Sequence, residues 1–237
     1  MLFSCQRGRA IVKVDDSALL TKEYNFDTDI KTIQSLDIID VEYIQEETRS
    51  VILNCPEQLM DKTDIKMEGN TLSVGMKKST TLWNISGDLK IKLTVSAPNV
   101  TNFSTSGSAD IITSDLNGTD YEFLSQGSGD ITTGSITATS LNATSLGSGD
   151  LDIAGFKGKD AWILTQGSGD VDIKSIHSDF AQFSSQGSGD IEAHLSDCGK
   201  VEVKSFGSGD IELSGKCSQF TEEALGSGKI KYHQLSI

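Results

Sequence analysis

Six aspartates recur in this sequence, each at the end of a short Gly-Ser-Gly or Gly-Ser-Ala segment and each twenty residues from the next. They are Asp110, Asp130, Asp150, Asp170, Asp190 and Asp210. Carboxylates repeated in this way could hold calcium, act in pairs as acid and base, or accept backbone hydrogen bonds at turns. Which chemistry applies depends on the elements that place them side by side.

The first glycine of each copy defines the period. Gly107, Gly127, Gly147, Gly167, Gly187 and Gly207 are 20 residues apart, and Gly226 follows after 19. A fixed period without a helical pattern is typical of a solenoid, in which each unit buries its apolar face only against its neighbours. Glycine at this offset in every copy indicates a corner that needs either positive φ or a close backbone approach.

Residues four positions after each first glycine form an aliphatic column: Ile111, Ile131, Leu151, Val171, Ile191, Ile211 and Ile230. The next residue in each copy drifts toward charge and is expected to face outward: Ile112, Thr132, Asp152, Asp172, Glu192, Glu212 and Lys231. This alternation is that of a strand, and 20 residues span about 60 Å of extended chain. The sequence predicts an all-β fold, a single-stranded right-handed parallel β-helix with ~20-residue coils and an irregular N-terminal cap.

A second strand precedes each glycine, with a hydroxyl side chain two positions before it: Thr105, Ser125, Ser145, Thr165, Ser185 and Ser205. These hydroxyls are expected to face inward and hydrogen-bond to one another along the stack. The pattern favours a structural ladder over nucleophilic chemistry.

The N-terminal half has strand signals at residues 36–44, 50–53 and 88–95, a turn at 68–72 and a short helix at 56–60. We expect residues 1–19 to form an N-terminal tail, residues 20–106 to form irregular β coils and residues 107–237 to form the regular part of the β-helix. No linker composition separates the last two, so they are predicted to be one continuous domain.

The net charge of −14 argues against nucleic acid and anionic lipid headgroups as partners. No stretch approaches the ~18 apolar residues that would span a bilayer. Residues 2–5, LFSC, look like the end of a bacterial lipoprotein signal, in which Cys5 would be lipidated and would provide the only membrane attachment; the alternative is an ordinary cysteine in a frayed terminus. Cys198 and Cys217 share nearly the same offset, which predicts packing in one column or, if their β-carbons converge, a disulfide.

The run of GSGDI coils, with GNTLSV at 69–74 and DLKIKLTVSAPNV at 88–100, resembles the autotransporter-adhesin head family, also called the GIN domain family. The resemblance covers residues 20–237. It implies a right-handed β-helix at the cell envelope, often with a lipoprotein or secretory signal, and thus an outer-membrane lipoprotein or a cell-surface protein. It implies no established activity.

Stacking would place the six aspartates about 4.8 Å apart, where like charges repel by roughly 0.9 kcal/mol in water and about 3.5 kcal/mol at a dielectric of 20. Three remedies are open. The carboxylates could accept backbone N–H bonds at the corner, they could bind calcium between coils, or they could join Asp152, Asp172, Glu192 and Glu212 in an acidic binding face for cationic or polyhydroxylated partners. In the last coil Lys229 and Lys231 replace the acids and are expected to neutralise Asp210 and Glu212.

Evidence for catalysis is thin. His177, His194 and His233 are the only histidines and do not predict a metal site, and acidic pairs such as Asp150 with Asp152 recur on several coils, so none is distinctive. No cofactor is indicated, and no oligomeric state. The sequence favours a non-enzymatic surface module, an adhesin for a repetitive ligand such as a glycan or for a surface protein. The alternatives are a passive envelope spacer and, less favoured, a polysaccharide lyase or hydrolase.

Overall fold

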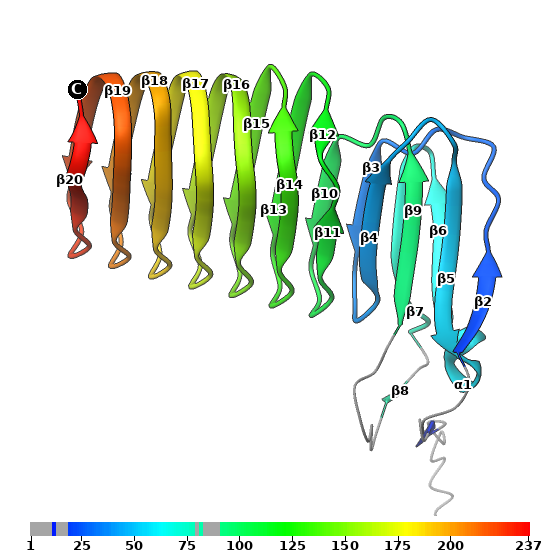
Figure 1. Cartoon of the computed structure of the whole chain (residues 1–237). Coiled ribbons are helices and arrows are strands. Elements are labelled where there is room, and N and C mark those ends of the chain that lie inside the picture. Colours follow the sequence, from blue (N-terminus) through cyan, green and yellow to red (C-terminus); the bar gives the residue numbers. More distant parts are fainter. Residues whose placement is uncertain (1–10, 13–18, 79–80, 83–90) are drawn as a thin grey trace, which may run out of the picture.

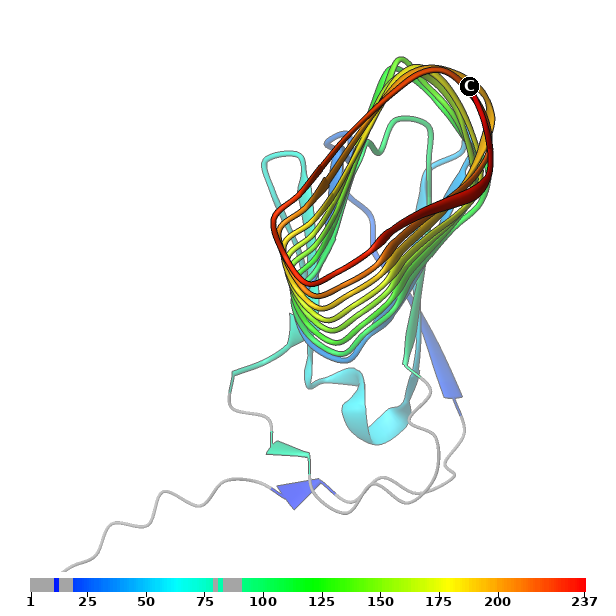
Figure 2. The ribbon, with the colours of Figure 1, turned by 90° about the vertical axis from the view of Figure 1, so that its left-hand side faces the viewer.

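Each regular coil has two extended sides and two corners, and the coils stack into a parallel β-helix of about seven turns (Figure 1). The computed structural model describes residues 11–12, 19–78, 81–82 and 91–237. Seen along the stack, the regular coils superimpose as flattened loops around a common interior (Figure 2). The predicted fold class is confirmed.

The strands of the regular part follow one another in chain order. They are β10 (Asn102–Thr105), β11 (Ile111–Thr113), β12 (Leu116–Asn117), β13 (Asp120–Ser125), β14 (Ile131–Thr137), β15 (Ser140–Ser145), β16 (Leu151–Thr165), β17 (Val171–Ser185), β18 (Ile191–Ser205), β19 (Ile211–Ala224) and β20 (Ile230–Ser236). From β16 to β19 one long strand covers both sides of a coil.

Two parallel sheets result from this winding. The first sheet contains the segments that follow each aspartate, and the second sheet contains the segments that precede each first glycine. Pairing is in register at an offset of 20, as between Ile131 and Leu151 in the first sheet and between Ala143 and Ile163 in the second. We call the Gly-Ser-Gly-Asp turn from the second sheet to the first the glycine corner, and the turn at the other end of each coil the opposite corner.

Inward-facing side chains fill the loop. The aliphatic column from Ile111 to Ile211 is almost completely buried, and so are Phe103, Phe123 and Phe183 in the second sheet. The rings of Phe103 and Phe123 stack with centroids 5.1 Å apart. Because no coil can bury these groups alone, the core is one continuous cluster along the stack.

The N-terminal part joins the same stack in a different order. Strands β3 (Thr32–Ser35) and β4 (Asp40–Gln45) pair in parallel with β10 and β11 on one side. On their other side they pair in parallel with β7 (Thr71–Met76) and β9 (Lys92–Ala97). The coil at residues 32–45 therefore lies between later parts of the chain, with β10 and β11 on one side and β7 and β9 on the other.

Antiparallel strands cover the far end of this part. They are β5 (Ser50–Pro56), which pairs with β9 and with β2 (Leu19–Glu23), and β6 (Thr63–Glu68), which pairs with β7 through a turn at Gly69. Helix α1 (Glu57–Met60) follows β5, as predicted, and buries Leu59. Strands β1 (Ile11–Val12) and β8 (Thr81–Leu82) form a separate two-stranded parallel sheet.

The strand expected over residues 36–44 begins only at Asp40. β3 ends at Ser35 and β4 begins at Asp40, because Leu36–Ile39 form a glycine-type corner without glycine. Of the strand signal at residues 88–95, the structure assigns strand from Lys92, and residues 88–90 lie outside the described residues.

Candidate functional site

The corner aspartates form a file in which each carboxylate is hydrogen-bonded to the next coil. Oδ1 of each aspartate accepts the backbone N–H of its successor: Asp110 from Asp130 at 2.9 Å, Asp130 from Asp150 at 2.9 Å, Asp150 from Asp170 at 2.8 Å, Asp170 from Asp190 at 2.7 Å and Asp190 from Asp210 at 2.6 Å. The file ends where Asp210 accepts the N–H of Lys229 at 2.8 Å. These bonds offset the repulsion between stacked carboxylates and leave Oδ2 of each without a partner on the next backbone.

The file has a seventh member, Asp40, that the 20-residue period does not predict. Oδ1 of Asp40 accepts the N–H of Asp110 at 3.1 Å, and partial burial raises the pKa of Asp40. The spacing of 70 residues hides it from a 20-residue period. The local sequence could have predicted it, since Ser35 and Asp40 have the same spacing as the hydroxyl and carboxylate residues Thr105 and Asp110.

The first glycines allow a close backbone approach. A Cβ added to Gly127, Gly147, Gly187, Gly207 or Gly226 would lie 2.0 Å from the carbonyl oxygen of the first glycine one coil earlier, and one on Gly167 would lie 1.8 Å away; for Gly107 the oxygen is that of Asp37, at 2.0 Å. That carbonyl accepts two N–H groups, as Gly167 O does from Ser188 at 2.8 Å and Gly189 at 3.3 Å. Positive φ, the other explanation, does not apply, since among the described glycines only Gly69 and Gly215 have it.

The buried hydroxyls form hydrogen bonds across the glycine corner of their own coil and not between coils. Ser125 Oγ donates to Gly129 O at 3.1 Å and Thr165 Oγ1 to Gly169 O at 3.0 Å, both within one coil. The expected ladder between coils is therefore wrong, because a carbonyl of the same coil lies closer. Ser205 Oγ alone among the described buried side-chain N and O atoms has no hydrogen-bond partner.

Beside the file lies an acidic ridge on the first sheet, formed by Asp152, Asp172, Glu192 and Glu212. The four side chains are in register on successive coils and point outward; Asp172 is half-buried and the others are exposed. A shallow depression of about 310 Å³ separates part of the ridge from the corner file and includes Asp150, Asp170 and Asp190. The structure thus brings the two predicted sets of acids together on one edge of the first sheet.

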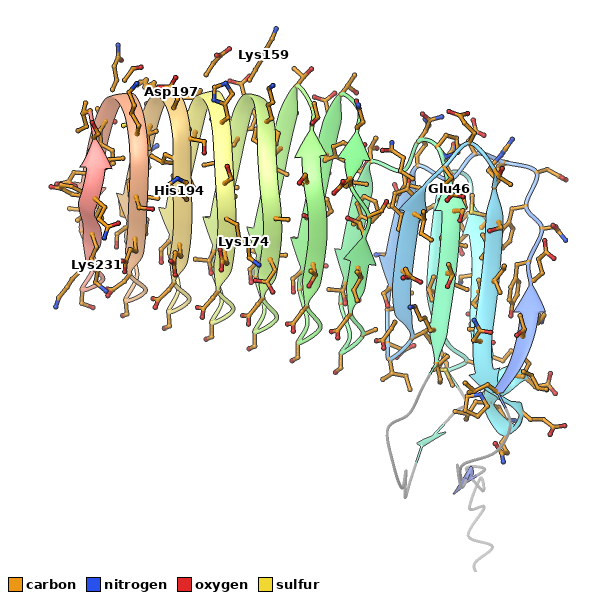
Figure 3. All side chains as sticks on the ribbon, viewed as in Figure 1. Glu46, Lys159, Lys174, His194, Asp197 and Lys231 are labelled. Atoms are coloured by element: carbon orange, nitrogen blue, oxygen red, sulfur yellow. The ribbon has the colours of Figure 1, made fainter. Side chains whose placement is uncertain are left out.

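Electrostatics differ along the ridge. Partial burial, followed by the charges of Asp172 and Asp150, raises the pKa of Asp152, while Lys174 opposes this shift. At the other end Lys231 Nζ lies 2.8 Å from Asp210 Oδ2 and 4.0 Å from Glu212 Oε2 (Figure 3). The hydrogen bond that the Lys231 side chain donates to Asp210, followed by the one from the backbone N–H of Lys229, lowers the pKa of Asp210. Of the four ridge residues only Glu212 lies near a lysine as an ion pair in the described part of the chain, so the unpaired negative charge lies at Asp152, Asp172 and Glu192.

The remaining candidates do not converge on a reactive centre. His177 Nδ1 lies 2.6 Å from Ser196 O, and His194 Nδ1 lies 3.0 Å from Ser214 Oγ. The side chain of His233 and all of Cys5 lie outside the described residues. Across the described part of the chain, no three His, Cys, Asp or Glu side chains are grouped so that they could hold a metal ion.

The two cysteines with the same offset pack without a bond. Cys198 and Cys217 are register partners, and both are buried free thiols. Cys198 Sγ donates to Ile176 O at 3.1 Å, and burial raises the pKa of both thiols. Of the two explanations for their shared offset, column packing is the one that the structure shows.

The fold and this surface define a class of protein, a β-solenoid that presents a repetitive acidic edge. Residues 29–193 and 161–237 match the family described as "Putative auto-transporter adhesin, head GIN domain". The chain belongs to this family, as its sequence motifs indicated. Among curated proteins none matches.

Solved structures share the fold at low sequence identity. A "putative adhesin" of Bacteroides fragilis has a TM-score of 0.81 and 21% identity, covering 93% of this chain and 99% of that chain. A "putative adhesin" of Parabacteroides merdae has a TM-score of 0.74 and 20% identity, covering 94% and 98%. A "putative lipid binding protein" of Parabacteroides distasonis has a TM-score of 0.68 and 18% identity, covering 94% and 99%. Proteins with different descriptions thus share this architecture, which by itself does not define a ligand.

The family description, an auto-transporter adhesin, indicates a protein of the cell surface or envelope. Within the described residues no helix is long and apolar enough to cross a bilayer.

Proposed function

We propose that this protein is a non-enzymatic adhesion module of the cell surface or envelope that binds a repetitive ligand, such as a glycan, along its acidic ridge. The family description supports adhesion as the general role. The ridge supplies the site, because its four carboxylates repeat at the coil spacing of about 4.8 Å and could contact successive units of a polymer.

The observation behind this proposal is the concentration of unpaired acid at Asp152 and Asp172. The raised pKa of Asp152 reflects partial burial and like-charge neighbours. A ligand with amino groups or hydroxyl donors would relieve this repulsion, whereas a phosphate or sulfate polymer would increase it. We therefore expect cationic or polyhydroxylated ligands to be selected.

Regularity argues against catalysis. The acidic pair formed by a corner aspartate and a ridge residue recurs from Asp150–Asp152 to Asp210–Glu212, so the same two groups are repeated on four successive coils. A glycosidase requires two carboxylates in two different roles, which demands two different environments.

For attachment to the envelope we propose lipidation of Cys5, which would make the protein an outer-membrane lipoprotein.

A passive spacer is the second candidate, favoured by one observation. The corner aspartates use Oδ1 to hold adjacent coils together, so their repetition is explained by folding without a ligand. A spacer would tolerate changes to the ridge but would lose its role when a coil is deleted. An adhesin would lose ligand binding when the ridge alone is changed.

The test is a binding array of glycans and matrix proteins, probed with the labelled chain in millimolar calcium and again in chelator. The ridge variant D152N/D172N/E192Q/E212Q is compared with a control of equal charge change, E46Q/E47Q/E57Q/E223Q, whose side chains lie elsewhere on the surface. We expect saturable binding that only the ridge variant loses. Binding that both variants keep would exclude the ridge, and the absence of any binding would favour the spacer. Dependence on calcium would assign the file of aspartates a role in ion binding.

A further inference from the structure

The second sheet contains a surface that the acidic ridge does not include. Five outward positions on three adjacent coils have no ionisable group: Asn142, Thr144, Trp162, Leu164 and Gln182; Ser184, at the sixth position of this set, is buried. They form two columns, with Asn142, Trp162 and Gln182 in register in one and Thr144, Leu164 and Ser184 in the other. We call this surface the tryptophan window.

Trp162 is the central side chain of the window. It is 37% exposed although it is one of the largest apolar side chains of the molecule. Phe180, on the next coil, contacts it with ring centroids 6.3 Å apart and planes inclined at 58°. Lys200 Nζ lies 6.0 Å from the centroid of Phe180 on the side of the following coil. The indole is therefore supported from one side and remains accessible from solvent.

Hydrogen-bonding groups flank the indole in both directions along the stack. Lys204 Nζ donates to Gln182 Oε1 at 3.1 Å, which orients that amide and leaves its NH₂ group available. The amide of Asn142 and the indole N–H of Trp162 have no hydrogen-bond partner among the described residues. The window thus combines one flat apolar surface with donors on either side of it.

Charges of both signs border the window. Glu202 Oε1 lies 2.6 Å from Lys200 Nζ and Glu202 Oε2 lies 3.7 Å from Lys204 Nζ. Two further carboxylates border it: Glu122 is the register partner of Asn142, and Asp160 precedes Trp162 by two residues on the same strand. In a molecule of net charge −14, the window itself is an area without ionisable side chains. A cationic ligand would be directed to the acidic ridge and a strongly anionic one would be repelled by the molecule as a whole.

We propose that the tryptophan window is a binding site for uncharged saccharide chains, in which the C–H face of a pyranose ring stacks on the indole of Trp162 and ring hydroxyls accept hydrogen bonds from Asn142 and Gln182. The chemistry matches because such a ring has one apolar face and equatorial hydroxyls, and carries no charge. Three coils span about 10 Å, so a few sugar units contact the window. This inference goes beyond the proposed function, since it concerns the other sheet and does not require the ridge.

The sequence offers a direct probe of this site. Trp83 and Trp162 are the only tryptophans, so the variant W83F makes Trp162 the single source of indole fluorescence. This variant is titrated with cellohexaose, xylohexaose, mannohexaose and a linear β-1,3-glucan hexamer, and calorimetry on the unaltered full chain provides a second readout. We expect saturable changes in emission with at least one of the four, and no change with glycerol at the same concentration of hydroxyls.

Matched variants identify the contacts. W162A is expected to lower the association constant at least tenfold, W162F to restore most of it, and Q182A to lower it severalfold. F206A is the control, because Phe206 is an aromatic of similar exposure (40%) outside the window. The ridge variant is expected to bind as well as the unaltered chain. If none of the four saccharides binds, if W162A binds normally, or if the ridge variant and not W162A loses binding, the proposal is overturned.

Discussion

The two corners of each coil differ in how much sequence change they accept. The glycine corner repeats as Gly-Ser-Gly-Asp, with a carbonyl of the previous coil 1.8–2.0 Å from where a Cβ would be. The opposite corner has Ala138, Gly158, Ser178 and Cys198 at successive equivalent positions, and the register shifts there between Leu195 and Cys198. Backbone also approaches backbone closely at Gly158, where a Cβ would lie 2.1 Å from Ala138 O, but larger residues occupy this position on the other coils. Close approach on nearly every coil fixes residue identity at the glycine corner, whereas the opposite corner can be repacked in several ways.

Single-residue changes in coil length are absorbed at the opposite corner. Ile176 pairs with Leu195 at an offset of 19, and Phe180 with Lys200 again at 20. Backbone in the left-handed region occurs here, at Asp197 (φ 64°) and Gly215 (φ 94°). The 19-residue spacing between Gly207 and Gly226 follows from the same adjustment, since Leu195 pairs with Gly215 but Cys198 with Cys217.

The largest expected effect tests this comparison directly. Gly167→Ala should lower the free energy of unfolding by at least about 3 kcal/mol, because its Cβ would overlap a backbone oxygen that cannot rotate away. Gly155→Ala is the matched control, since its Cβ would meet nothing closer than 3.4 Å. Urea denaturation of both variants measures the difference. Equal destabilisation would mean that backbone contact at the glycine corner is not what fixes the residue.

The corner aspartate can be tested separately from its charge. Asp170→Ala removes the acceptor of the Asp190 N–H and should cost about 1–2 kcal/mol, as loss of a capping side chain does. Asp170→Asn keeps an acceptor oxygen and reduces the repulsion along the file, so its stability should equal or exceed that of the unaltered chain. An asparagine variant as unstable as the alanine variant would show that the negative charge itself is required.

The inner side of the corner contains a natural pair for comparison. Ser145→Ala removes a buried hydrogen bond of 3.1 Å to Gly149 O and should cost about 1 kcal/mol. Ser205→Ala removes a hydroxyl without a partner and should be neutral or stabilising. Thermal unfolding of the two variants compares them. Similar losses in both would indicate that packing of the hydroxyl, and not its bond, stabilises the corner.

The smallest expected effect concerns pH. The folded-state pKa of Asp152 is raised, so the folded chain binds this proton more tightly than the unfolded chain, and the penalty from its charge is present at neutral pH and disappears as pH falls through the folded pKa. Asp152→Asn should therefore be slightly stabilising at pH 7, and this gain should vanish at acidic pH. Asp210, with a lowered pKa, has the opposite sign and loses its stabilising contribution as pH falls. Denaturation at several pH values tests both; a gain from Asp152→Asn that does not depend on pH would contradict the assignment.

Much of the fold could be predicted because each coil of a solenoid repeats the same pattern of inward-facing and outward-facing residues. With the 20-residue period, the aliphatic column beginning at Ile111 predicted the first sheet and the hydroxyl column beginning at Thr105 predicted the second. The order of the N-terminal strands was not predictable, because the coil at residues 32–45 contacts residues 102–113 across an inserted segment, and such contacts leave no period in the sequence.

The candidate surfaces differ in the same way. The acidic ridge could be predicted because its members repeat at one offset, while Asp40 was missed for lack of a period. The tryptophan window was not predicted, since outward positions of the second sheet vary freely and Asn142, Trp162 and Gln182 resemble one another only in lacking charge. Whether such a set forms one surface depends on the register, which is a property of the folded chain.

The glycine corner also limits how proteins of this architecture can change in size. Each corner is bonded to the one before it, so a gain or loss of a few residues there would separate every later coil from its partner. Whole coils can be duplicated or removed without this penalty, and each changes the length of the molecule by about 4.8 Å. The length of such a protein can therefore change in steps of one coil. One-residue differences in coil length are accommodated at the opposite corner.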